Sequence, residues 1–88
     1  MQAKRINGFH QLDREMICYW KTDYGWQIYF PKYGIGGLGK HKIDEHEDGT
    51  ITVSPSILIT FWVTDDGVEL EGPMTIHGFL EKGVWRDV

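Results

Sequence analysis

Thr50–Val63 (TITVSPSILITFWV) is the stretch of this sequence that decides its fold. It is rich in β-branched and aromatic side chains, which favour strands over helices. A second stretch of the same kind follows at Met74–Trp85 (MTIHGFLEKGVW), and turn dipeptides such as Asp48-Gly49 and Asp66-Gly67 bound the two stretches. Together they predict an all-β protein.

The first stretch contains two expected strands. Pro55 interrupts the hydrogen-bond ladder because proline has no N–H to donate, so we expect a bulge or bend there. After it, Ile57, Ile59, Phe61 and Val63 alternate onto one face. Ile57–Val63 is therefore predicted to be the most buried strand.

Further hairpins are expected on both sides of these stretches. Asn7-Gly8 predicts a short opening hairpin, and Met16–Trp20 with Trp26–Phe30 predicts a second. Downstream turns are predicted at 65–67, 71–73 and 81–83, and the glycine-rich and polar residues 31–49 predict a long loop. We predict a small antiparallel sandwich or barrel of about six to eight short strands, with at most one short helical turn, in a single domain over residues 1–88.

Size and charge narrow the class of protein. Eighty-eight residues form a small core that leaves little room for a deep substrate cleft, so a non-enzymatic role is favoured. The one cysteine, Cys18, excludes an intrachain disulfide, and its apolar neighbours predict that it is buried and inert. With no apolar leader after Met1, a cytoplasmic location is expected. Residues 1–42 hold seven Lys/Arg and three Asp/Glu, whereas residues 43–81 hold nine Asp/Glu and no Lys or Arg. The chain presents either a basic and an acidic face or charges scattered over its surface.

Two sequence patterns resemble a phosphate-binding loop and a metal site, but each lacks features that such a site requires. Gly34–Lys40 (GIGGLGK) fits the glycine pattern of phosphate-binding loops, but His41 stands where a magnesium-binding hydroxyl is needed and no helix is predicted to follow. His41, His46 and His77 are metal-ligand types without the short, fixed spacing of zinc sites. No cofactor and no metal are expected, and His77 is expected to be a structural histidine rather than a general base.

The aromatic residues of the first half are the best candidates for a binding surface. All four tyrosines and two tryptophans lie within residues 19–33, and buried phenols need hydrogen-bond partners, so at least Tyr24, Tyr29 and Tyr33 are expected to be partly exposed. The alternative is that these tyrosines simply cover a sheet face. The predicted partner-binding residues are Tyr19, Lys21, Tyr24, Tyr29, Lys32 and Tyr33, together with the acidic Asp44, Glu45, Glu47 and Asp48.

The two β stretches also carry a family resemblance. Ser54-Pro55-Ser56-Ile57-Leu58-Ile59 followed by His77-Gly78-Phe79 resembles a family of small phage-encoded proteins of unassigned function, in which a Ser-Pro-Ser-hydrophobic strand precedes a Cys-His-x-Phe hairpin. Ile76 stands where that family has its cysteine, so any zinc site of the family would be dismantled here. The resemblance implies a phage or mobile-element protein acting in the host cytoplasm.

From these patterns we expect a non-enzymatic accessory protein that binds a bacterial host protein. By analogy it would inhibit that protein, which would be a component of a defence or nuclease system. The alternative is single-stranded nucleic-acid binding, with bases stacking on the tyrosines and phosphates held by the interleaved lysines.

Overall fold

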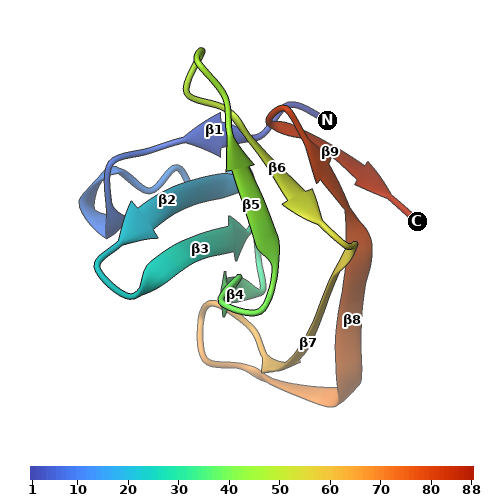
Figure 1. Ribbon diagram of the computed structural model, residues 1–88. Helices are drawn as coiled ribbons and strands as arrows, with labels where there is room; N and C mark the ends of the chain where they lie inside the picture. Colours follow the sequence, from blue (N-terminus) through green and yellow to red (C-terminus); the bar gives the residue numbers. More distant parts are fainter.

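The computed structural model describes residues 1–88 and contains nine strands and one three-residue 3-10 turn, η1 (Phe9–Gln11). This confirms the all-β prediction, with one more strand than the predicted range (Figure 1). The strands are β1 (Lys4–Arg5), β2 (Cys18–Thr22), β3 (Gly25–Phe30), β4 (Gly34–Gly37), β5 (Lys42–Glu45), β6 (Ile51–Ser54), β7 (Ile57–Val63), β8 (Glu69–Glu81) and β9 (Val84–Asp87).

The strands form three sheets rather than a closed barrel. β1-β2-β3-β4 make a four-stranded sheet, β5-β6 a two-stranded sheet and β7-β8-β9 a three-stranded sheet. Neighbouring strands are antiparallel except β1 and β2, which run parallel. In Figure 1 the first sheet and the β7-β8-β9 sheet lie on opposite sides of the molecule, with β5 and β6 between them at one end.

The predicted bend at Pro55 is where the chain changes sheet. β6 ends at Ser54 in the two-stranded sheet, and β7 begins at Ile57 in the three-stranded sheet. The Ser54-Pro55 peptide bond is cis. Because proline cannot donate to a ladder, it stands between two strands that pair with different partners.

The predicted turn at Glu71-Gly72-Pro73 is wrong. These residues lie inside the 13-residue strand β8. The pairing of β8 with β7 shifts there, from Phe61 opposite Met74 to Val63 opposite Glu69, so extra residues of β8 bulge from the ladder. Turn-forming residues that interrupt a strand locally produce a bulge when hydrophobic pairing resumes on both sides.

Two other predicted segments differ in the structure. Asn7-Gly8 does not form a hairpin, because the short strand β1 pairs in parallel with β2 and the chain between them passes through η1. Residues 31–49 are not one loop, since they contain β4 and β5. In contrast, the hairpin turns at Asp66-Gly67 and Lys82-Gly83 are confirmed, and Gly67 and Gly83 adopt φ of 84° and 75°.

The core lies between the sheets, and a second cluster lies behind the first sheet. The main cluster includes Trp26, Ile28 and Phe30 of β3 together with Leu80 and Trp85. The second cluster contains Ile6, Cys18, Trp20 and Tyr29, packed beneath residues 12 and 16. Both faces of β2 and β3 are therefore covered.

This double coverage overturns the prediction that β7 is the most buried strand. Only Ile57 and Phe61 of β7 are buried, whereas four of the six residues of β3 are buried. Cys18 is fully buried, as predicted, and burial raises the pKa of its thiol. The lone helical segment is the short turn η1, and no helix has the length and hydrophobicity needed to cross a bilayer.

Candidate functional site

Two of the predicted binding tyrosines are not at the surface. Tyr19 and Tyr29 are each only 1% exposed. Tyr19 lies in the main core beside Trp26, and Tyr29 points to the opposite side of the sheet into the second cluster. The expectation that Tyr29 is partly exposed is therefore wrong, because the segment between β1 and β2 covers the sheet face that alternation alone leaves open.

The other two tyrosines lie apart from each other. Tyr24 is 99% exposed at the β2–β3 turn. Tyr33 is half-buried and stacks on Phe61, with the ring centroids 6.0 Å apart. Lys21 and Lys32 are exposed, and their ammonium groups lie 5.9 Å from the Trp26 ring and 5.7 Å from the Tyr33 ring. Only Tyr24 has a fully exposed ring. The tyrosines therefore do not form a row of exposed rings on which successive bases could stack, as the nucleic-acid alternative requires.

The predicted acidic residues of the β5–β6 hairpin are exposed, but two of them are engaged within the chain. Glu45 accepts a hydrogen bond at 2.9 Å from Arg5. Asp48 accepts hydrogen bonds from the hydroxyl and amide of Thr50, and these bonds lower the pKa of its carboxyl group. Asp44 and Glu47 form no ion pair in the chain.

The histidines do not converge on a metal site, and no group of three or more ligand-type side chains is formed. His46 Nε2 lies 2.7 Å from the Thr52 hydroxyl. His41 donates from Nε2 to the backbone oxygen of Ser56 at 3.1 Å. His77 Nε2 lies 2.9 Å from the hydroxyl of the same serine, so one histidine contacts the backbone of Ser56 and the other its side chain.

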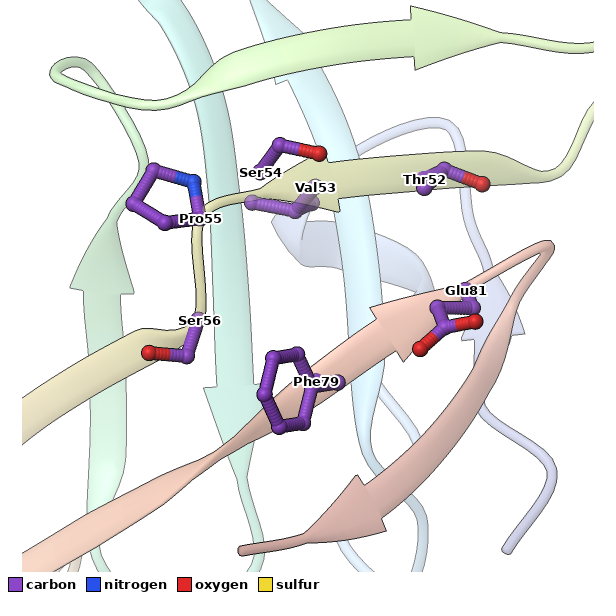
Figure 2. Close-up of a pocket in the computed structure, with 7 residues that line it drawn as sticks. All are labelled: Thr52, Val53, Ser54, Pro55, Ser56, Phe79 and Glu81. Atoms are coloured by element: carbon purple, nitrogen blue, oxygen red, sulfur yellow. The ribbon is translucent and has the colours of Figure 1, made fainter.

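The contact between Ser56 and His77 joins the two motifs of the resemblance. It sits beside a hollow of about 420 Å³ lined by Thr52, Val53, Ser54, Pro55, Ser56, Phe79 and Glu81. Figure 2 shows Pro55 at the bend between β6 and β7, with Phe79 and Glu81 on the neighbouring β8. A serine nucleophile needs its histidine oriented by a third group, and Ser56 is the only side chain that hydrogen-bonds to His77. Through this bond His77 connects β8 to the bend between β6 and β7.

The largest unexpected feature is one face of the β7-β8-β9 sheet, hereafter the outer face. Leu58, Thr60 and Trp62 of β7 point to it, opposite in phase to the buried Ile57 and Phe61. By cross-strand register it continues through Thr75, His77 and Phe79 of β8 and Arg86 of β9. Leu58 and Trp62 are 59% and 62% exposed. The β7 part of this face is open to solvent, whereas at Phe79 the face borders residues 52–56 across the hollow.

Unpaired acidic residues lie in and just after the β7–β8 turn, at one end of the sheet, and by register Glu69 lies opposite Val63 rather than on the outer face itself. Asp66, Glu69 and Glu71 are exposed in or just after the β7–β8 turn and make no ion pair within the chain. Val68, in the same turn, is 60% exposed. A large aromatic ring, aliphatic side chains and free carboxylates therefore share one end of the sheet.

The neighbouring Asp65 has a different role, because it fixes the turn to the rest of the protein. It accepts a hydrogen bond from the Tyr29 phenol at 2.7 Å and forms an ion pair with Arg14. Its backbone amide donates to the Lys32 oxygen at 2.7 Å. These bonds anchor one end of the outer face to the first sheet, so the exposed side chains are carried on a fixed turn.

Sequence reasoning missed the outer face because it took the whole run 57–63 as core. The available signal was the alternation itself, which places Leu58, Thr60 and Trp62 on a second face. A strand is covered on both sides only when two other layers exist, and this small chain supplies that second layer to β2 and β3 instead. Comparison with known proteins found no matching family model, curated protein or solved structure.

Proposed function

We propose that this protein binds another protein through the outer face, with Trp62 and Leu58 as its anchors. The observation that carries the proposal is the exposure of Trp62 and Leu58 on the β7 part of the outer face, which is open to solvent. Tryptophan is among the residues most enriched at the energetic centres of protein interfaces. Exposed apolar side chains gathered on one face, rather than scattered singly, are typical of interaction sites.

The negative charge beside this face indicates the kind of surface that the partner presents. Asp66, Glu69 and Glu71 have no cationic partner in the chain, so they favour a protein surface that carries lysine and arginine. A nucleic acid is disfavoured at the same place because its phosphates would meet these carboxylates. The proposed partner is a basic surface of a bacterial host protein, such as the nucleic-acid groove of a nuclease or defence component, and occupying that groove would inhibit it. The proposed role is non-catalytic.

Affinity capture from nuclease-treated bacterial lysate tests this proposal when matched baits are compared. The baits are the natural protein, Trp62→Ser and, as the control, Tyr24→Ser, which removes an even more exposed aromatic ring at the β2–β3 turn. We expect a basic protein to be retained by the natural bait and by Tyr24→Ser. Trp62→Ser should weaken its binding by about 30-fold or more, the effect of losing an interface centre worth about 2 kcal/mol.

The acidic residues need a separate variant. Replacing Asp66 with Asn and both Glu69 and Glu71 with Gln should weaken binding mainly at low salt, because exposed charges are screened as ionic strength rises. Retention that is the same for all baits, or that is seen only when the nuclease treatment is omitted, would contradict the proposal.

A further inference from the structure

A second hollow, of about 340 Å³, lies between the first sheet and the β7-β8-β9 sheet, hereafter the inter-sheet pocket. Its lining is mostly apolar. Ile17, Phe30 and Trp85 are each no more than 4% exposed, and Tyr33 and Ile76 are partly exposed. The Phe30 and Trp85 rings meet edge to face, with their centroids 5.0 Å apart. Three aromatic rings from β3, the β3–β4 turn and β9 therefore contribute to one pocket.

Two carboxylates, Glu15 and Asp87, also line the inter-sheet pocket. Asp87 follows Trp85 by two residues on β9, so the two side chains lie on the same face of the sheet. The Trp85 indole Nε1 donates to Asp87 Oδ1 at 2.8 Å, which holds this carboxylate beside the aromatic ring. Both acidic residues are exposed, and neither forms an ion pair within the chain.

Two cations of the chain lie near the inter-sheet pocket and leave its carboxylates unpaired. The terminal ammonium group of Met1, which also lines the pocket, donates to the backbone oxygen of Trp85 at 2.9 Å. The Lys32 ammonium group lies 5.7 Å from the Tyr33 ring, but Lys32 does not line the pocket. Two carboxylates against one ammonium group leave the lining with a net negative charge.

The same combination of ring and carboxylate holds an arginine at two other places in this protein. The Arg5 guanidinium lies 5.0 Å from the Trp26 ring and 2.9 Å from the Glu45 carboxylate. The second set has the corresponding distances 4.5 Å and 3.0 Å and consists of Arg86, Phe79 and Glu81. The inter-sheet pocket has the rings and the carboxylates of such a set but no arginine of its own.

We propose that the inter-sheet pocket binds the side chain of an arginine in a partner polypeptide. The methylene groups of arginine would pack on the apolar lining while its head stays near water. The planar guanidinium stacks on aromatic rings and pairs with carboxylates through a fixed fork of N–H donors, which an ammonium group cannot do. A volume of about 340 Å³ is at the lower end for ligand pockets and suits a single long side chain.

This pocket is separate from the outer face. Ile76 lies between Thr75 and His77 on β8, and alternation directs it to the opposite side of the sheet. The same holds for Trp85 relative to Arg86 on β9. The pocket proposal therefore does not depend on the proposed function, and Trp62→Ser, which alters only the outer face, should leave arginine binding unchanged.

The probe is N-acetyl-arginine N-methylamide, which represents an arginine within a polypeptide. Titration at low salt is followed by NMR of the four tryptophan indole N–H groups. We expect saturable binding with a Kd of about 1 mM, with the largest shift at Trp85 because its N–H bonds to Asp87. The citrulline analogue has nearly the same shape but no charge and should bind at least about tenfold more weakly. Free arginine should also bind more weakly, because its own carboxylate meets Glu15 and Asp87.

Matched variants locate the site. Glu15→Gln combined with Asp87→Asn removes both charges, while the Asn amide oxygen can still accept from Trp85, so the fold should be retained. This double variant should weaken binding of the probe at least about tenfold. Asp44→Asn combined with Glu47→Gln removes two unpaired charges from the β5–β6 hairpin and should have no effect.

Four results would overturn the proposal. They are the absence of saturable binding up to about 20 mM probe, equal binding of the citrulline analogue, equal affinity in the Glu15→Gln/Asp87→Asn variant, and shifts confined to an indole other than that of Trp85. Tighter binding of free arginine than of the blocked probe would overturn the assignment to a polypeptide. Equal binding of N-acetyl-lysine N-methylamide would overturn the choice of arginine.

Discussion

The phenol of Tyr29 donates a hydrogen bond to the carboxylate of Asp65 at 2.7 Å, joining β3 to the turn between β7 and β8. The two residues are 36 positions apart in the chain. The bond gives a buried phenol its partner and, with the ion pair from Arg14, fixes the turn that carries the acidic residues beside the outer face.

Because of the Tyr29–Asp65 bond, the free energy of unfolding should depend on pH in the acid range. The hydrogen bond from Tyr29 and the pairing with Arg14 hold the pKa of Asp65 below its ordinary value of 3.8. A carboxylate whose pKa is lowered on folding stabilises the protein above its unfolded pKa and loses that contribution as pH falls through the folded pKa. Asp65→Asn should therefore be less stable than the natural protein at pH 6, and the difference should shrink below about pH 4. Thermal unfolding of the natural protein and of Asp65→Asn from pH 2 to 7 measures this difference in stability. Asp66→Asn, the exposed neighbour without a partner, should show no such change.

Truncating the four tyrosines should separate core from surface. Tyr19→Ala and Tyr29→Ala should each lower the free energy of unfolding by about 3–5 kcal/mol because both rings are fully packed. Tyr24→Ala should change it by less than about 0.5 kcal/mol. Tyr33→Ala should fall between these limits, since the ring is half-buried against Phe61. Chemical denaturation of the four variants gives these values, and a Tyr29→Ala variant as stable as the natural protein would refute the described packing of the second cluster.

Gly78 is predicted to be intolerant of any side chain. A Cβ atom there would lie 2.5 Å from the backbone oxygen of Arg86 and would also clash with the Trp85 ring. Gly78→Ala should destabilise the protein by about 1–3 kcal/mol, as overpacking does. Gly72→Ala is the control in the same strand, because nothing lies within 4 Å of the position its Cβ would take. Equal melting temperatures for the two variants would contradict the close approach of β8 and β9 at this point.

The Gly34–Lys40 segment should not bind nucleotides. Gly34–Gly37 pair with β3 as an edge strand, and no helix follows to direct its N-terminus at a phosphate. Titration with ATP or GTP should give no saturable signal in the micromolar range. Saturable binding that is lost in Lys40→Ala would show that this segment does act as a phosphate site.

The fold should form without metal. His41, His46 and His77 hydrogen-bond to Ser56 and Thr52 and do not surround a common metal position. A chelator should therefore leave the melting temperature unchanged. Elemental analysis of purified protein provides the complementary measurement. A fall of several degrees on adding chelator would reveal a metal site involving His41, His46 or His77.

Much of the β architecture could be predicted from local pattern. The alternation in 26–30, the turns at Asp66-Gly67 and Lys82-Gly83, and the interruption at Pro55 depend on φ preferences and side-chain spacing, which neighbouring residues determine. Each of these predictions is confirmed. Local pattern also predicted the burial of Cys18, which lies between apolar neighbours.

The location of the candidate site depends on which sheet faces are covered by another part of the chain. Only the tertiary structure decides that. The sequence by itself determined that Trp26, Ile28 and Phe30 share one face and that Leu58, Thr60 and Trp62 share another. Tertiary structure decided that residues 6–16 cover Tyr29, whereas nothing covers Trp62. The physical reason is that alternation assigns a side chain to a face but carries no information on whether another layer packs there, and an 88-residue chain has too few layers to cover both faces of every sheet.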